Sequence, residues 1–200
     1  MPRTGRRPGR PDTRAQIVAA AARRFAESGY DATSMRQVAA DAAVDPALVR
    51  RFFGGKEQLF TEVAAAVVDP ASALAAVADG PPGEAGERLL RYFLGLLGEV
   101  HQPGPLLGLI RSAVTSEHAA GVLRRFLAET VLGGIAAGLD ADQPELRAAL
   151  VGSQLVGLAV ARYAVRLGPL AAVSADELAR QVGPVLQCYL TSDHITQEEP

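Results

Sequence analysis

The most constraining feature of the sequence is a run of closely spaced helix starts and stops near the N-terminus. Ser34-Met-Arg-Gln37 fits a capping box, in which the serine and glutamine side chains each bind a backbone N–H at a helix start. Asp45-Pro46 marks a second start, because aspartate caps a first turn well and proline suits the first helical position. Gly54-Gly55 then ends that helix. The pattern predicts two short helices, about 34–41 and 46–52, joined by a tight turn, which is a helix-turn-helix.

The remainder of the chain also predicts helices and shows no alternating strand pattern. Thr13-Arg-Ala-Gln16 fits another capping box, and apolar residues at helical spacing follow it as far as Gly29. Pro81-Pro82 separates later segments, because proline cannot continue a helix. We therefore predict an all-α fold of about nine helices. Besides the two short ones, they cover about 13–28, 56–67, 84–100, 104–115, 117–138, 143–168 and 174–191.

Charge is divided unevenly along the chain. Residues 1–60 contain 11 Arg and Lys against 6 Asp and Glu, a net of +5, whereas residues 61–200 contain 9 against 16, a net of −7. A basic N-terminal part on an acidic remainder is typical of proteins that present one end to a nucleic acid. The alternative is a chance distribution of surface charge.

The second helix of the pair has the composition of a DNA-reading helix. The major groove of B-DNA is about as wide as an α-helix, so such a helix can bring its side chains to the base edges. We expect a small core behind it, formed by Val38, Ala39, Val44, Val49 and Phe53, with Ala39 small because the helices cross there. The residues left facing outward, toward bases and phosphates, are Pro46, Ala47, Leu48, Arg50 and Arg51.

A dense run of residue types and spacings covers about a quarter of the chain, from Thr13 to Phe60. It includes Phe25-Ala-Glu-Ser-Gly29-Tyr30, Thr33-Ser34-Met-Arg-Gln-Val38-Ala39 and Val44-Asp-Pro-Ala-Leu-Val-Arg-Arg-Phe52-Phe53-Gly-Gly-Lys56. These residues resemble the DNA-binding head of the TetR family of transcriptional regulators. The rest of the chain resembles that family only in the number and lengths of its helices.

The resemblance implies an all-helical homodimer whose first three helices bind an operator in double-stranded DNA. A fourth helix would link them to a body with a pocket for a small-molecule effector, whose binding releases the DNA and ends repression. The implied domains are a flexible basic arm at 1–11, a DNA-binding domain at 12–70 with its helix-turn-helix at about 34–53, a ligand-binding and dimerisation domain at 71–192, and a tail at 193–200.

The resemblance also implies roles for single residues. Thr33 and Ser34 would begin the second helix near phosphate, and Arg36 would lie on the DNA side of that helix. Lys56 would contact a phosphate at the start of the fourth helix, where the helix dipole attracts anions. The residues expected in the groove are Ala47, Leu48, Arg50 and Arg51.

Two residues depart from the family pattern. Ala43 stands where the family has a glycine in the turn, and a left-handed alanine there would cost about 1–2 kcal/mol. Arg50 stands where the family has a tyrosine that contacts phosphate. Because arginine binds either phosphate or the edge of guanine, Arg50 has two open roles, positioning the protein or reading a base.

The basic arm has two interpretations. Arg6-Arg7-Pro8-Gly9-Arg10-Pro11 resembles the core of an AT-hook, in which arginines such as Arg7 and Arg10 lie in a narrow minor groove. The alternative is a solubilising tail that makes loose phosphate contacts.

The last two predicted helices are the expected pairing surface. Helix 143–168 is apolar nearly all round and contains small residues such as Ser153 and Gly157, which allow close helix approach. Pairing it and helix 174–191 with their copies would form a symmetric four-helix bundle, with a kink expected at Pro184. The alternative is burial within one subunit.

Polar or aromatic residues on apolar helices are the candidate ligand contacts. Gln154 and Tyr163 lie on the helix predicted to be most buried, so they need hydrogen-bond partners in the protein or in a ligand. Arg111 and Arg162 can each hold a carboxylate, or face solvent or an acidic neighbour. Ordinary core packing is the alternative for each of the candidates, which are Tyr92, Phe93, His101, Arg111, Thr115, Phe126, Gln154 and Tyr163.

No catalytic or metal site is expected, and no cofactor. His101, His118 and His194 are far apart, and no residues have the spacing of a metal site, a nucleophilic triad or a phosphate loop. Cys188 is the single cysteine and no apolar stretch is long enough to span a membrane, which favours the reducing cytoplasm. We therefore expect a small-molecule-responsive repressor. The alternatives are an activator, a regulator controlled by a partner protein, and an all-helical enzyme whose N-terminal motif is fortuitous.

Overall fold

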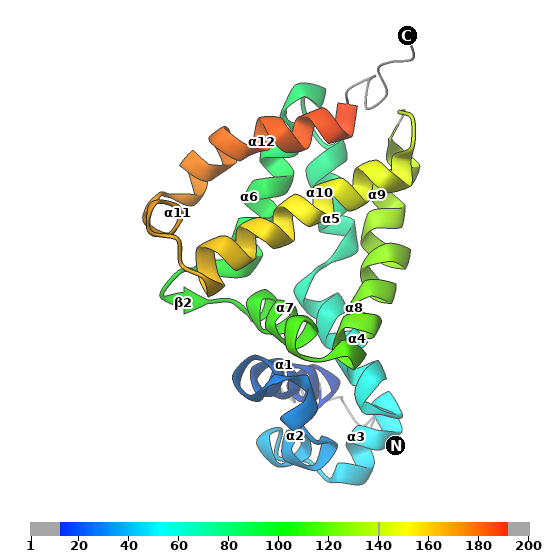
Figure 1. Ribbon diagram of the computed structural model, residues 1–200. Coiled ribbons are helices and arrows are strands. Elements are labelled where there is room, and N and C mark those ends of the chain that lie inside the picture. The colour runs from blue at the N-terminus through cyan, green and yellow to red at the C-terminus, as the bar shows by residue number, and fades with distance from the viewer. Residues whose placement is uncertain (1–12, 140, 192–200) are drawn as a thin grey trace, which may run out of the picture.

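The computed structural model describes residues 13–139 and 141–191, which fold into a small head and a larger body (Figure 1). The all-helical prediction is confirmed, apart from one hairpin of two-residue strands. The head occupies the lower end of Figure 1, and a fourth helix leads from it into the body. These helices are α1 (Thr13–Ala32), α2 (Met35–Asp41), α3 (Pro46–Phe53) and α4 (Lys56–Val67).

The body contains the remaining elements, two of which are π-helical segments that continue an α-helix. They are η2, which joins α8 to α9, and η3, which follows α10. In chain order the elements are α5 (Pro70–Ala78), the 3₁₀ turn η1 (Pro82–Glu84), α6 (Ala85–Leu97), β1 (Gly98–Glu99), β2 (Gln102–Pro103), α7 (Pro105–Thr115), α8 (Glu117–Phe126), η2 (Leu127–Leu132), α9 (Gly133–Gly138), α10 (Pro144–Ala159), η3 (Val160–Ala164), α11 (Gly168–Ala172) and α12 (Ala175–Thr191).

The structure adds α5, α11 and the hairpin to the predicted elements. Asp69 caps α5, because its carboxylate accepts hydrogen bonds from the N–H groups of Ala71 and Ser72 at 3.3 and 3.1 Å. Gly98, with φ of 69°, ends α6 three residues before the predicted boundary and pairs with Pro103 in the hairpin. The capping side chain and the left-handed glycine explain both differences.

An aromatic cluster fixes α1 against α4. The rings of Phe25 and Tyr30 each pack edge-on against Phe60, with centroids 5.0 and 5.1 Å apart. All three side chains are buried. Such pairs contribute about 0.5–1.5 kcal/mol each beyond the burial of their surface. α4 is thereby held rigidly to the helix that supports the helix-turn-helix.

The body rests on the head through α7, which lies directly on α1. Gly108 of α7 is so close to α1 that a Cβ on this glycine would lie 2.6 Å from the Cα of Ala26. Four residues along α7, Ser112 Oγ donates a hydrogen bond to the Phe25 carbonyl at 3.3 Å. The two helices therefore contact each other backbone to backbone.

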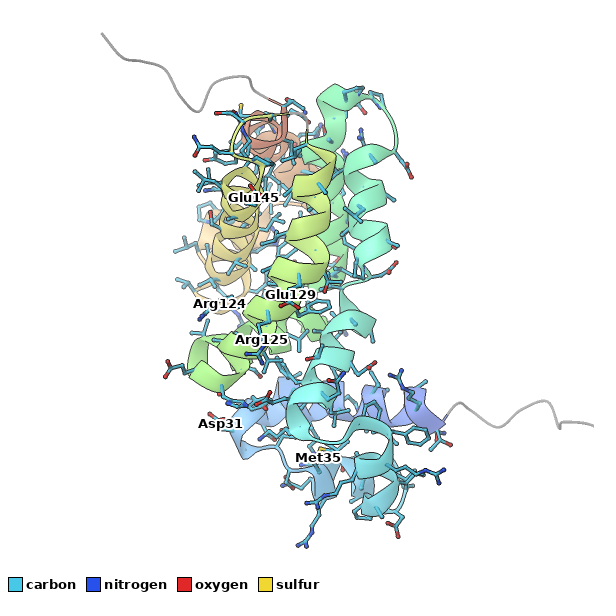
Figure 2. All side chains as sticks on the ribbon, turned by 90° about the vertical axis from the view of Figure 1, so that its right-hand side faces the viewer. Asp31, Met35, Arg124, Arg125, Glu129 and Glu145 are labelled. Atoms are coloured by element: carbon cyan, nitrogen blue, oxygen red, sulfur yellow. The ribbon has the colours of Figure 1, made fainter. Side chains whose placement is uncertain are left out.

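Polar contacts join the same junction from the side of α8. Ser116 Oγ donates a hydrogen bond to Asp31 Oδ1 at 3.0 Å, and Figure 2 shows Asp31 at the boundary between head and body. His118 Nε2 lies 2.5 Å from Glu57 Oε1, which links α8 to α4. Head and body are thus connected on two sides.

α10 contains a fully buried charge. The Arg147 guanidinium pairs with the carboxylate of Asp142, and its Nε also donates a hydrogen bond to the Asp142 carbonyl at 2.6 Å. Its Nη1 donates to the Tyr189 carbonyl at 3.3 Å, which ties α10 to α12. The start of α10 and the end of α12 lie at the end of the body away from the head (Figure 1).

Residues Lys56–Ala78, spanning α4 and α5, are long and apolar enough to cross a membrane on length and composition alone. Two observations argue against a single membrane-spanning helix. Asp69 interrupts the helix and caps α5, and Leu59 and Val63 are fully buried against other helices.

Candidate nucleic-acid interface

The two helices of the helix-turn-helix begin at the predicted caps. Ser34 and Gln37 form a complete capping box, in which the Ser34 N–H donates to Gln37 Oε1 at 2.8 Å and the Gln37 N–H donates to Ser34 Oγ at 3.3 Å. Asp45 Oδ1 accepts a hydrogen bond from the Ala47 N–H at 2.7 Å. Both helices lie at the end of the head farthest from the body (Figures 1 and 2).

The turn between them requires a left-handed residue, and that residue is Ala43. Its φ is 52°, and the next residue, Val44, donates its N–H to the Ala39 carbonyl at 3.0 Å to close the turn. An L-residue with a Cβ is strained in this conformation, whereas glycine is not. The turn is therefore built with a residue poorly suited to it.

We expect Ala43→Gly to raise the free energy of unfolding by about 1 kcal/mol, because it relieves this strain and the exposed Ala43 methyl group contributes no burial. Thermal melts should show a gain of about 2–4 °C for a chain of this size. Ala40→Gly, at an exposed position inside α2, is the matched control and should lower stability by about 1 kcal/mol. A loss of stability with Ala43→Gly would contradict the strained turn.

The outer surface of α3 carries the residues predicted to meet DNA. Arg50 and Arg51 are exposed, and neither has a hydrogen-bond or ion-pair partner among the residues that the structure describes. Pro46 and Ala47 are also exposed, whereas Leu48 is half-buried. Behind them lies the predicted core, in which Val38, Ala39, Val49 and Phe53 are buried and Val44 is half-buried.

Thr33 directly precedes the Ser34 cap of α2, as predicted, but its side chain is turned inward, and a contact with phosphate there stays a prediction. Thr33 is only 3% exposed, and its Oγ1 donates a hydrogen bond to the Gly29 carbonyl at 2.7 Å. The hydroxyl therefore provides a hydrogen-bond donor for a backbone carbonyl near the end of α1. Ser34, which caps α2, and Arg36 on α2 are exposed, and their contacts with DNA stay a prediction.

Lys56 begins α4 as predicted, but its ammonium group is engaged within the head. Nζ lies 4.3 Å from the centre of the Tyr30 ring and donates a hydrogen bond to the Asp31 carbonyl at 3.3 Å. Partial burial lowers the pKa of the Lys56 ammonium group. The predicted phosphate contact is therefore not supported by its position, and Lys56 instead braces α4 against the end of α1.

An ion pair fixes α2 to α1. Arg24 Nη2 donates to Asp41 Oδ1 at 2.8 Å, and this hydrogen bonding by Arg24 lowers the pKa of the Asp41 carboxyl group. The contribution of the pair is complete above the ordinary aspartate pKa of about 3.9 and is lost as the pH falls through the lowered value. The orientation of α2 is therefore maintained at neutral pH.

Phe52 is a surface residue of α3 that the sequence reasoning missed. Its side chain is 43% exposed, and its ring centroid lies 6.1 Å from that of Phe53. The sequence did contain a signal for its exposure. Leu48 was predicted to face outward, and Phe52, four residues later, lies on the same helix face. An exposed apolar group beside two arginines suits contact with a thymine methyl group.

Arg7 and Arg10 of the basic arm, and the tail at 193–200, lie outside the described residues. Their predicted roles stay predictions.

Most of the residues predicted to line a ligand pocket do not gather in one place. The hydroxyl groups of Tyr92 and Tyr163 donate hydrogen bonds to the carbonyls of Asp69 and Gly98, at 3.0 and 2.7 Å, so both have protein partners. The expectation that Gln154 is buried is wrong, because α10 turns this residue outward.

The remaining candidates are scattered as well. Thr115 Oγ1 donates a hydrogen bond to the Arg111 carbonyl of its own helix at 3.0 Å. Arg111 itself is exposed, whereas Arg162 is buried at 5% exposure. Phe126 is buried, Phe93 is half-buried, and His101, Arg111 and Thr115 are exposed.

Two hollows in the described part of the chain are large enough to hold a small molecule. One of about 850 Å³ lies between α1, α4 and the start of α7, and is lined mainly by alanine and valine side chains. Another of about 540 Å³ lies between α6, the hairpin, η3 and the start of α12, and brings together His101, Arg162 and Tyr163. Over residues 13–139 and 141–191 no three His, Cys, Asp or Glu side chains are grouped as a metal ion would require.

Two family models match the chain. The model described as bacterial regulatory proteins, tetR family, matches residues 17–63, which include the helix-turn-helix. The model described as tetracyclin repressor-like, C-terminal domain, matches residues 83–190. No match is found among curated proteins.

Solved structures resemble the chain over nearly its full length. A TetR-family regulator from Streptomyces coelicolor A3 is 39% identical, with a TM-score of 0.66, over 93% of this chain and 98% of its own. A transcriptional regulator from Rhodococcus sp. Rha1 is 24% identical, with a TM-score of 0.60, over 90% and 96%. NalD, the secondary repressor of the MexAB-OprM multidrug efflux pump in Pseudomonas aeruginosa, is 22% identical, with a TM-score of 0.65, over 91% and 98%. At the two lower identities the likeness concerns the fold.

Proposed function

The chain belongs to the TetR family of DNA-binding transcriptional regulators, and on that basis we propose that it is a homodimeric repressor controlled by a small molecule. In this proposal residues 12–70 bind an operator in the cytoplasm. Residues 71–192 form the dimer and bind the effector, and effector binding releases the DNA.

The observation that carries the proposal is the outward placement of Arg50 and Arg51 on α3. Both side chains are exposed, at the end of the head farthest from the body. Their helix is held in place by its Asp45 cap and by the burial of Val49 and Phe53 in the core. Rigidly presented arginines suit both phosphate contacts and paired hydrogen bonds to guanine.

An exposed apolar face on α10 and α12 supports the homodimer. Leu146 and Val156 on α10 are 46% and 37% exposed, and Val185 on the adjoining α12 is 44% exposed. Both helices run across the front of the body in Figure 1 and along the left edge in Figure 2, so they form one face. Large apolar side chains that are exposed on neighbouring helices are typical of a protein interface. Pairing through it would supply the second DNA-binding head that a near-palindromic operator requires.

Selection of bound duplexes from a random pool, followed by sequencing, tests the DNA-binding part of the proposal. We expect a near-palindromic site whose half-sites lie about 34–36 Å apart, or a multiple of that distance. Lower transcription from a reporter that carries the selected site would support repression, and higher transcription would support an activator. A protein that selects no sequence and binds no duplex at low salt would contradict the proposal.

We expect Arg51→Ala to weaken binding to the selected operator by about 1–3 kcal/mol and to relax sequence preference at one position, as loss of a base contact would. Fluorescence anisotropy on operator and scrambled duplexes measures both effects. An equal loss on both duplexes would mark Arg51 as a phosphate contact, and the same comparison with Arg50→Ala decides between its two roles. Arg124→Ala, at an exposed position on the body (Figure 2), is the control and should leave binding unchanged.

A further inference from the structure

Arg162 is a buried cation whose hydrogen bonding is incomplete. It lies in the π-helical segment η3, and π-helical segments often occur at functional sites. Its Nη1 donates a hydrogen bond to the Leu170 carbonyl, and its guanidinium carbon lies 5.6 Å from the centre of the Tyr163 ring. Its Nε is buried and has no hydrogen-bond partner among the described residues. Arginine cannot lose its proton, so the buried Nε–H of Arg162 needs a hydrogen-bond acceptor from outside the described residues.

No carboxylate of the described residues pairs with Arg162. Asp176 lines the same hollow but pairs with Arg91, with Oδ1 and Nε 3.3 Å apart. Arg147, the other buried arginine, shows the contrast, since it pairs with Asp142 and also binds backbone carbonyls. A buried cation ordinarily has a counter-charge, and Arg162 has none within the part of the chain that the structure describes.

Arg162 forms part of the wall of the 540 Å³ hollow. The C-terminal half of α6, hairpin residues 98–101, η3 and residues 171–176 enclose it, in the region of β2 and α11 in Figure 1. Its size falls within the range of about 300–1,000 Å³ that is usual for small-molecule sites. Leu94, Val100 and Val173 supply apolar surface, so the hollow combines an apolar lining with a buried cation.

We propose that this hollow binds a small monocarboxylate with a compact apolar body, and that the Arg162 guanidinium holds its carboxylate group. A guanidinium donates two parallel hydrogen bonds to a carboxylate, and with Nη1 engaged by Leu170 the edge that includes Nε is the one that remains. The ligand supplies the counter-charge that Arg162 does not find among the described residues. The inference deepens the small-molecule control proposed above and rests on it for the effect on DNA.

The acidic residues around the hollow restrict the charge of the ligand. Glu99 and Asp176 line it together with Arg91, which pairs with Asp176, and Arg162, so the lining has no excess of positive charge to hold a ligand with two negative charges, such as a phosphate monoester. A single carboxylate neutralises Arg162 without adding further negative charge. The chemistry therefore favours a monoanion.

A short structural path links the hollow to the head. Tyr163, which follows Arg162, donates its hydroxyl to the Gly98 carbonyl in β1 at 2.7 Å. The hairpin leads directly into α7, whose Gly108 lies against Ala26 of α1. A ligand that moves Arg162 and Tyr163 moves the hairpin, and through α7 it acts on the head.

Isothermal titration of the full-length protein without DNA tests the site. The probes are acetate, benzoate and octanoate, each compared with its uncharged amide. We expect at least one carboxylate to bind about ten-fold or more tightly than its amide, because charged hydrogen bonds are lost in the amide. If no carboxylate binds more tightly than its amide, the proposed site is wrong.

Variants then locate the preference for the carboxylate. Arg162→Gln should abolish it, and Arg162→Lys should keep only part of it, because lysine retains the charge but not the planar pair of donors. Arg111→Gln, an exposed arginine on α7 outside the hollow, is the matched control and should leave the preference intact. Melting curves confirm that each variant is folded. A full preference in Arg162→Gln would overturn the assignment.

A further experiment distinguishes carboxylate binding in the hollow from its effect on DNA. Operator affinity is measured with and without the carboxylate that binds most tightly. Release of DNA by the wild type, and its loss in Tyr163→Phe at a carboxylate concentration that saturates this variant, would support the path through the hairpin. Carboxylate binding that leaves operator affinity unchanged would overturn control through this site. Sequence-specific DNA binding, tested by the pool selection, would stand in either case.

Discussion

Asp142→Asn is expected to lower the free energy of unfolding by about 3–5 kcal/mol, because it leaves a buried arginine without a counter-charge. Arg147 is fully buried, and its Nε lies 3.1 Å from Asp142 Oδ1. Asparagine keeps the size and shape of aspartate, so the substitution removes the charge and little else. At about 2–4 °C per kcal/mol for a chain of this size, the melting temperature should fall by about 10 °C.

Two comparisons isolate the charge effect. Adding Arg147→Met to Asp142→Asn removes the buried cation as well, so the double variant should be more stable than Asp142→Asn alone. Asp176→Asn removes an exposed partner of Arg91 and should change stability by less than about 1 kcal/mol. A similarly small loss with Asp142→Asn would show that Arg147 does not depend on this carboxylate.

Val156→Glu is expected to dissociate the proposed homodimer. Val156 is 37% exposed on α10, so a charge there is tolerated in a single protomer. In a two-fold interface it would bury two unpaired like charges, at a cost of about 2–5 kcal/mol or more. Sedimentation velocity at micromolar concentration should then show monomers, with a corresponding loss of operator affinity.

The matched control for this experiment is Val114→Glu. Val114 is 73% exposed on α7, outside the α10 and α12 face, and its replacement should leave the molecular mass unchanged. Circular dichroism should show equal helix content in both variants. A dimer that persists in Val156→Glu would place the interface on another surface.

The head was predictable because its architecture depends on local signals. The Ser34 and Asp45 side chains cap helices that begin within a residue of the predicted starts, and Gly29 breaks the first helix with φ of 77°. Even the strain at Ala43 followed from its place in the turn. Side-chain direction was harder to predict, since Thr33 stands at the predicted place in the chain and yet bonds inward to Gly29.

The helices of the body were predicted from the sequence, but the position of a ligand site among them was not. A helix that is apolar on every side does not reveal which side packs within the protomer, so Gln154 was expected inside and lies outside. From the sequence, Arg162 and Arg111 were equally good candidates to bind a carboxylate. Only tertiary packing buries Arg162 and exposes Arg111. The path from Tyr163 to Gly98 joins residues 65 apart in the chain, a separation that no local pattern encodes.

The contact between Gly108 and Ala26 makes the joint between α7 and α1 mechanically stiff. No side chain separates the two backbones there, so no change of rotamer can absorb a displacement of α7. A small tilt of α7 must therefore swing the whole head, and the lever arm from this joint to α3 enlarges the motion. In a pair of protomers the swing would change the span between the two α3 helices, which has to match the helical pitch of the duplex.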